Sequence, residues 1–292
     1  MISKKKINDV IAILCMTLLS VIMFAPILLM FATSLKSMGE ISSREGLLHF
    51  FIPVKAHFSN FTEALQQGDW NRYFYNTFLV TVVTVIISLV INSMAGFAFA
   101  RLNFRGRDQL FFIGLVGLMI PPQATIIPVF FILKNFPLAG GNNIFGQGGM
   151  GFINTHFALM APYLAGSFGV FLFRQFFLNF PQALDDAARI DGLSRFGAFL
   201  RIHVPLSKPV FASLLVMKAT QCWNEYTWPL IVTTTDRMRT LQIALVIFKD
   251  EVHTQWNYMM AMTLIIIAPL AILFLLAQKA FVEGIVTSGI KG

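Results

Sequence analysis

The chain has 292 residues, of which 56% are hydrophobic and only 12% are charged, and its formal net charge is +8 at pH 7. Soluble domains carry about 25% charged residues, so this composition excludes an ordinary soluble domain and predicts a single membrane domain over residues 1–292. Basic residues beside membrane helices set their orientation, so the positive charge does not indicate a nucleic-acid partner.

Six apolar runs are long enough to be membrane spans, because a helix needs about 20 residues to cross a hydrocarbon core about 30 Å thick. They lie near residues 9–35, 74–100, 109–134, 154–176, 209–233 and 256–279. The sequence therefore predicts an all-α membrane protein with six transmembrane helices.

The first run begins like a secretory signal, with lysines at positions 4–6. It is much longer than the apolar core of a signal peptide, which has about 7–15 residues, so we expect it to be retained as a span. Lysine and arginine are denser before this span, in residues 101–107 and between spans four and five than on the opposite side. The positive-inside rule then predicts that both termini are cytoplasmic.

Two connections fall on the external side in this orientation. Residues 36–73 mix charged and aromatic residues, and we expect them to form a partly helical cap. Residues 140–151 are rich in glycine and contain a G-x-G-x-x-G match. A dinucleotide fingerprint requires a preceding strand and a following helix, so these glycines are interpreted as turn formers.

The cytoplasmic connection between spans four and five, residues 177–208, carries the clearest pattern. Pro181 suits a first helical position, and Asp185 and Asp186 lie near the positive end of the helix that it would begin. Gly192 stands where a helix stop favours positive φ. The pattern predicts two short helices separated by a break at Gly192.

One face of the first short helix presents small side chains beside a single leucine, since Leu184, Ala187, Ala188 and Asp191 recur at helical spacing. An amphipathic helix resting on lipid headgroups is the alternative. Three aspartates against one arginine give the wrong charge for an anionic leaflet. The pattern therefore favours docking to a protein over binding to a membrane surface.

At these residues the chain resembles a known family. The string D-D-A-A-R-I-D-G at Asp185–Gly192, followed by F-L-R-I-H-V-P-L-S-K-P at Phe199–Pro209, is similar to the cytoplasmic "EAA" loop of binding-protein-dependent ABC importer permeases. Asp185 and Asp186 replace the usual glutamates. The blocks at Trp223–Leu230 and Phe281–Gly292 resemble the smaller permease subunit of maltose-type carbohydrate importers, and the resemblance covers the whole chain.

The resemblance implies the architecture of a type I (MetI-like) importer permease in a bacterial cytoplasmic (inner) membrane. It implies a heterodimer with a second permease, two ATPase subunits that bind Mg-ATP, an external solute-binding protein and a carbohydrate substrate. The loop would seat in the ATPase through Leu184, Asp185, Asp186, Ala187, Ala188, Asp191 and Gly192. The tail, Ser288, Gly289, Ile290, Lys291 and Gly292, would reach toward the interface of the two ATPases as an extended segment.

The sequence itself contains no G-x-x-x-x-G-K-[ST] motif for cradling phosphates. The chain is therefore expected to be a non-catalytic subunit that binds no cofactor. Its five histidines are scattered without metal-ligand spacing, so no metal site is predicted. Both cysteines fall in apolar runs and predict no disulfide.

Polar residues inside the fifth span form a candidate translocation path. Charged side chains are costly inside a bilayer, so those of Lys218, Gln221, Asn224 and Glu225 should face protein or water. A polar stripe along the substrate path and structural contacts with a partner helix remain equally open interpretations. Trp223 and Trp228 either stack on a sugar or pack in the core.

Span three contains Pro121, Pro122 and Pro128, which break its hydrogen-bond ladder. This predicts a kinked helix beside a cavity, whether that cavity is a substrate path or only a packing feature. Four further polar residues are expected to form hydrogen bonds between helices rather than to bind a ligand. They are Asn92, Ser93, Asn154 and His156.

The resulting functional hypothesis is the membrane subunit of an ATP-driven importer for a di- or oligosaccharide. One alternative keeps this assembly but changes the solute to a peptide, an amino acid or a phosphate compound. A second is an ion-coupled carrier with Lys218 and Glu225 as the coupling site, although no inverted repeat supports it.

Overall fold

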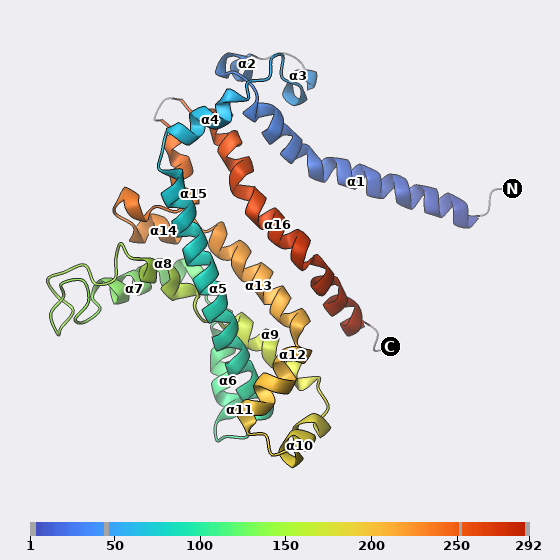
Figure 1. Ribbon diagram of the computed structural model, residues 1–292, viewed down its shortest axis with the longest axis vertical. Helices are drawn as coiled ribbons and strands as arrows, with labels where there is room; N and C mark the ends of the chain where they lie inside the picture. The colour runs from blue at the N-terminus through green and yellow to red at the C-terminus, as the bar shows by residue number, and fades with distance from the viewer. Residues whose placement is uncertain (1–3, 44–46, 251–252, 290–292) are drawn as a thin grey trace. The chain divides into compact units, whose positions relative to one another are not determined.

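The computed structural model describes residues 4–43, 47–250 and 253–289. Within these ranges the chain is helical apart from turns and one isolated antiparallel bridge between Lys249 and Thr254 (Figure 1). The all-α class predicted from composition and apolar runs is confirmed. The chain divides into two compact units, residues 1–70 with 244–269 and residues 71–243 with 270–292.

The first unit consists mainly of two long apolar helices and three short ones. The long helices are α1 (Lys4–Ser34) and the first half of α16 (Trp256–Gly289), and the short ones are α2 (Met38–Ser42), α3 (Leu47–Phe51) and α4 (Ser59–Gln66). Asn60 ties them together, because its amide nitrogen donates to the carbonyl oxygens of Ser34 and Lys36, and its amide oxygen accepts from Asn257. The partly helical character expected for residues 36–73 is confirmed.

The second unit is built around α5 (Trp70–Arg101). It contains α6 (Arg107–Val116), α7 (Pro122–Lys134), α8 (His156–Met160), the 3-10 turn η1 (Ala161–Tyr163) and α9 (Ser167–Leu178). The loop predicted to be cytoplasmic follows with α10 (Ala183–Ile190), α11 (Arg195–Ala198), the π turn η2 (Phe199–His203) and α12 (Val204–Leu206). After these come α13 (Lys208–Trp223), α14 (Thr227–Val232), the 3-10 turn η3 (Asp236–Met238) and most of α15 (Leu241–Ala244), which leads to the 3-10 turn η4 (Leu245–Phe248) of the first unit.

Three unbroken helices among the described residues are long and apolar enough to cross a membrane, at Asn8–Ser34, Trp70–Arg101 and Trp256–Gln278. Two further candidates are bent pairs, His156–Tyr163 with Ser167–Leu178 at 47° and Arg195–Leu206 with Lys208–Trp223 at 79°. Predicted span three is divided into α6 and α7 by residues 117–121, which end at Pro121, and Pro122 begins α7. The predicted count of six spans stays a prediction.

The break between η1 and α9 inside predicted span four was not anticipated. Gly166 is the N-cap of α9 and has an extended conformation with φ −170°. Pro162 belongs to η1, on the other side of the break. The Gly166 amide donates to the side-chain oxygen of Asn92 on α5. A side chain from a neighbouring helix therefore satisfies one of the backbone groups that the break exposes.

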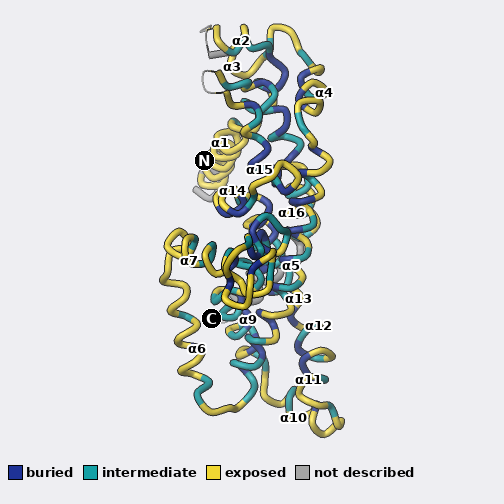
Figure 2. Tube along the Cα trace, turned by 90° about the vertical axis from the view of Figure 1, so that its left-hand side faces the viewer, coloured by how far each residue is buried: buried dark blue, intermediate teal, exposed yellow. Residues whose placement is uncertain are grey.

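Helices α5 and α9 cross at two glycines. A Cβ atom on Gly96 of α5 would lie 2.5 Å from Phe173 Cβ, and one on Gly169 of α9 would lie 2.7 Å from the Asn92 side chain. Around this crossing lies a core that includes Phe97, Phe173 and Phe177. The buried segments of α5 and α9 are dark in Figure 2, in contrast to the exposed α6. Glycine thus permits the close approach on which the core depends.

We expect Gly96→Ala to destabilise the protein by about 1–3 kcal/mol, because the added methyl overpacks a backbone contact. Thermal unfolding in mild detergent measures the effect. Gly114→Ala on α6 is the matched control, since a Cβ atom there meets nothing within 4 Å. Equal melting temperatures for the two variants would contradict this account of the crossing.

The predicted interhelical hydrogen bonds are present at two of the four residues. Besides the bond of Asn92 to the start of α9, His156 Nε2 lies 3.0 Å from Asn76 Oδ1 of α5. Asn154 precedes α8 and accepts from the amides of Thr234 and Thr235 in the connection after α14, so its bond joins two loops instead. The prediction for Ser93 is wrong, because its hydroxyl donates to the Val90 carbonyl of its own helix. In the glycine-rich connection, Gly146 and Gly151 have φ of 76° and 57°, which confirms their role in turns.

Candidate functional site: the loop at residues 177–208 and the cavity

Helix α10 ends as the sequence predicts. Gly192 has φ 73°, and the amides of Gly192 and Leu193 donate to the carbonyl oxygens of Arg189 and Ala188. These two bonds form a Schellman stop, which requires a residue that tolerates positive φ. The start of the helix differs from the prediction, because Pro181 precedes it and the capping residue is Gln182.

The structure corrects which face of α10 is available to a partner. Ala188 is only 1% exposed, and Leu184 and Asp185 are partly buried within the permease loop. Four exposed residues, Ala183, Asp186, Ala187 and Ile190, share the opposite side and form what we call the outer face of α10. Ile190 is 87% exposed. Leu184, Asp185 and Ala188 are thus poor candidates for contact, whereas Asp186, Ala187, Asp191 and Gly192 remain on the surface.

Asp185 instead anchors α10 to its own unit. Its carboxylate lies 3.3 Å from Nη1 of Arg101, the last residue of α5, and 2.9 Å from Nε2 of His203 in η2. Arg101 also donates to the Phe180 carbonyl oxygen. We call Arg101, Asp185 and His203 the anchor triad. It joins the end of the long helix α5 to both α10 and η2, the two arms of the loop at residues 177–208.

His203 lies in an aromatic pocket and is fully buried. Its ring centroid is 4.9 Å from that of Phe97, 5.7 Å from Phe177 and 5.5 Å from Phe180. The π turn of η2 places it there, with the Val204 amide reaching back to the Phe199 carbonyl oxygen. A turn of this kind contains one more residue than an α-turn and often marks a functional site.

A second charged cluster lies outside the anchor triad on the same side of the unit. Asp108 at the start of α6 is 3.1 Å from Arg107 and 3.7 Å from Arg174 of α9. The hydrogen bond from Arg107 lowers the pKa of the Asp108 carboxyl. The Arg174 guanidinium also stacks over the Phe111 ring, 4.0 Å from its centroid.

A cavity of about 880 Å³ lies within the second unit, which is within the range of about 300–1,000 Å³ typical of small-molecule sites. Its walls come from the junction of α6 and α7, from the break between η1 and α9, and from α13 with the start of α14. Polar residues on these walls include Gln123, Thr125, Ser167, Lys218, Gln221 and Glu225. The two interrupted spans therefore meet at one cavity, and the prediction that span three is a broken helix beside a cavity is confirmed.

The family model described as "Binding-protein-dependent transport system inner membrane component" matches residues 92–286, which is more than half of the chain. The chain belongs to this family. The resemblance seen at the EAA-like string of residues 185–192 is thereby confirmed, and the permease can be compared with characterised relatives.

Three relatives are similar over most of their length. The probable ABC transporter permease protein YurM of Bacillus subtilis is 32% identical over 269 residues, covering 91% of the permease and 83% of YurM. The arabinooligosaccharides permease AraQ of Halalkalibacterium halodurans is 32% identical, with 91% of both chains covered. The sn-glycerol-3-phosphate permease UgpE of Rhizobium meliloti is 32% identical, with 98% and 99% covered.

A solved structure, a bacterial ABC transporter involved in the import of the acidic polysaccharide alginate, contains a chain of the same fold. The TM-score is 0.79 at 21% identity, with 96% of the permease and 98% of that chain covered. This similarity supports the fold of the permease and, at this identity, carries no information about its substrate.

Of the six residues proposed for the translocation path, four line the cavity: Lys218, Gln221, Glu225 and Trp228. Asn224 does not line it, and its side chain bonds to the Thr220 carbonyl oxygen and to Gln242. Trp223 does not line it either and is 4% exposed. Helix α13 ends at Trp223, so the residues beyond it no longer follow the helical spacing on which the predicted polar stripe was based.

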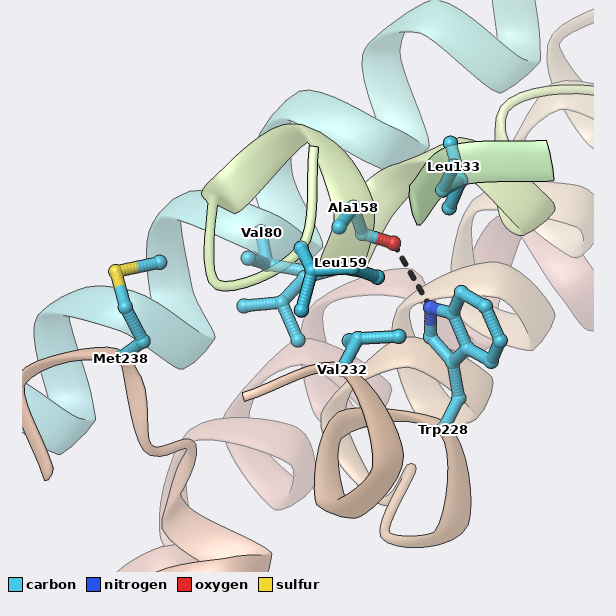
Figure 3. Packing of buried hydrophobic residues seen from close by; sticks show 8 residues of the cluster. Val80, Leu133, Ala158, Leu159, Trp228, Val232 and Met238 are labelled. Atoms are coloured by element: carbon cyan, nitrogen blue, oxygen red, sulfur yellow. Dashed lines mark hydrogen bonds between the residues drawn. The ribbon is translucent and has the colours of Figure 1, made fainter. Parts of the chain in front are cut away.

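Trp228 packs in the core rather than offering a free ring to a sugar. It is 3% exposed, and its indole Nε1 donates to the Ala158 carbonyl oxygen at 2.8 Å (Figure 3). Figure 3 shows it beside Val232 and facing Leu159. The alternative of core packing is therefore correct for this tryptophan, although its edge contributes to the cavity wall.

We expect Trp228→Phe to lower the stability of the permease by about 1–3 kcal/mol, because the buried Ala158 carbonyl loses its donor. Thermal unfolding in detergent measures the loss. Trp256→Phe serves as the control, since Trp256 is 45% exposed. A melting temperature equal to that of the wild type would show that the hydrogen bond contributes nothing.

The tail departs from the extended segment that was expected. Ser288 and Gly289 belong to α16, which continues to Gly289. Ile290, Lys291 and Gly292 lie outside the described residues.

Two members of the anchor triad were missed by sequence reasoning. Arg101 was assigned only an orientation role, and His203 was grouped with scattered histidines. His203 lies inside the family-like string at residues 199–209, and this position could have indicated a structural role. The histidines were assessed only for the spacing of metal ligands, which does not take such a position into account.

Proposed function

We propose that the permease is one of two membrane subunits of an ATP-driven importer for a carbohydrate. The observation that carries this proposal is the outer face of α10, which presents a nearly fully exposed isoleucine on a helix that the anchor triad fixes to the bundle. Burying such a side chain gains about 1.5–3 kcal/mol, so the face is suited to a groove on a partner. Family membership supports an ATPase as that partner.

The proposed assembly contains a second permease, two ATPase subunits that bind Mg-ATP, and an extracytoplasmic solute-binding protein. It would lie in the bacterial inner membrane, with both termini of the permease in the cytoplasm and the C-terminal tail near the ATPases. The permease would contribute no catalytic residue. Closure of the ATPases would move α10, and the anchor triad would pass this movement to α5.

The proposal of a carbohydrate substrate rests on the relatives. AraQ is named for arabinooligosaccharides and UgpE for sn-glycerol-3-phosphate. The cavity supports it, because hydroxyl-rich ligands need the mixture of donors and acceptors that Gln123, Gln221 and Glu225 supply. A phosphate compound is the alternative that UgpE favours.

Reconstitution of the purified assembly in proteoliposomes tests the proposal. We expect the permease to co-purify with an ATPase in mild detergent, and uptake of a radiolabelled carbohydrate to require internal ATP and the solute-binding protein. Uptake driven by a proton or sodium gradient without ATP would instead establish an ion-coupled carrier. Isolation without any ATPase would contradict the docking role of α10.

A further inference from the structure

Lys218 projects a cation toward the membrane cavity. It lies on α13 and lines the cavity, and its Nζ donates to the Tyr163 carbonyl oxygen at 3.4 Å. A Cβ atom built on Gly166 would lie 3.7 Å from the same Nζ. The amine therefore stands over the break between η1 and α9, where the absence of a side chain on Gly166 leaves room beside it.

No carboxylate among the described residues forms an ion pair with Lys218. An ammonium group has three donors, and only one long hydrogen bond uses them here. A lysine inside a membrane segment is costly unless it faces water or a partner. The cavity wall thus holds a cation whose remaining donors are available to a ligand.

The acidic residue that lines the same cavity, Glu225, does not pair with Lys218. Glu225 accepts a hydrogen bond from the Trp228 amide at 3.2 Å. Each charged group makes one hydrogen bond to the backbone, and the ammonium keeps two further donors for a ligand.

The backbone adds to the positive character of this wall. Helices α7 and α9 both begin at the cavity, and the capping residues Pro121 and Gly166 make no side-chain capping bond. The N-terminal ends of helices carry partial positive charge, and interrupted helices place such ends near anionic groups in transporters. They support a site whose charged group is Lys218.

We propose that the cavity recognises an anionic carbohydrate, one that carries a carboxylate or a phosphate ester, through Lys218. This inference rests on the proposed function, because it takes the cavity to be part of the translocation path. Gln221, one turn along α13, would contact the neutral hydroxyl groups of the same ligand.

The experiment compares Lys218→Met and Lys218→Arg in proteoliposomes that contain the complete importer and its solute-binding protein. The probes are a uronic-acid trisaccharide, a hexose phosphate and a neutral trisaccharide. Lys134→Met on α7 is the matched control, because this lysine does not line the cavity. The two anionic probes distinguish a carboxylate ligand from a phosphate ligand.

We expect the wild type to import at least one anionic probe. Lys218→Met should reduce its uptake tenfold or more, as is typical on loss of a charged hydrogen bond, while Lys218→Arg and Lys134→Met stay within about threefold. Import of the neutral probe alone, or equal losses for anionic and neutral probes in Lys218→Met, overturns the inference and leaves the carbohydrate function standing. If an assembly that hydrolyses ATP imports none of the probes, the carbohydrate function itself fails.

Discussion

Replacing Ile190 by aspartate is expected to abolish ATP-driven uptake and to release the ATPase from the permease in mild detergent. Ile190 is 87% exposed in the chain and is the largest apolar group on the outer face of α10. Burying a carboxylate in place of this side chain leaves an unpaired charge in the contact. Loss of one central apolar anchor costs about 2–4 kcal/mol of binding, and the buried charge adds to it, so uptake should fall by a factor of about 100 or more.

The control variant is Ile190→Leu, which keeps an aliphatic side chain of the same volume and should retain most of the uptake. The melting temperature of the isolated permease should be unchanged in both variants, because an exposed substitution alters stability by no more than about 0.5 kcal/mol. Full uptake by Ile190→Asp would show that the ATPase does not dock on this face.

Replacing Arg101 by alanine is expected to reduce uptake at least tenfold while the outer face of α10 still binds the ATPase. The substitution leaves Asp185 with His203 as its remaining partner and frees α10 from the end of α5. Breaking a buried pair by removing one partner costs about 3–5 kcal/mol, and a value near or below the lower limit is expected here because Asp185 is 23% exposed. ATP hydrolysis should then continue without proportionate transport.

The measurement is the ratio of substrate imported to ATP hydrolysed in proteoliposomes. Arg107→Ala is the matched control, since Arg107 lies close to Arg101 in sequence and pairs, within the part of the chain that the structure describes, with the exposed Asn103 and Asp108. In a double-mutant cycle, the loss of coupling in the Arg101→Ala, Asp185→Ala double variant should be much smaller than the sum of the losses in the two single variants. Additive effects would show that the two residues act independently.

The stop of α10 at Gly192 could be predicted from sequence because it depends on local chemistry. A glycine at that position permits the positive φ that two backbone bonds require. The division of span three followed in the same way from Pro121 and Pro122, since proline removes a donor wherever the chain goes.

The buried side of α10 could not be predicted, because helical periodicity sorts residues onto faces without saying which face is covered. Leu184 and Ala188 looked suited to a groove on a partner, but small apolar residues are equally what a helix uses to pack on its own bundle. The decisive partners, Arg101 and His203, are far from Asp185 in sequence. Only the folded chain brings these three residues together.

The cavity was only half predicted for a related reason. Lys218, Gln221, Asn224 and Glu225 were recognised together as polar residues inside a span, but the Asn224 side chain bonds to Thr220 and Gln242 and does not line the cavity. The sequence also did not distinguish sugar stacking from core packing for Trp223 and Trp228, and the structure shows both side chains buried. Aromatic residues serve cores and sugar sites alike.

The π turn at Phe199–His203 sets a limit on how this part of the chain can vary in length. Loops usually tolerate insertions and deletions, but here one residue more than an α-turn holds His203 against Asp185. Removing a single residue would rewind the turn and rotate the next helical segment by about 100°, the angle per residue of an α-helix. Evolution of this loop is therefore expected to proceed by substitution at constant length. Homologous permeases should then keep the same number of residues between the positions of Gly192 and Ser207.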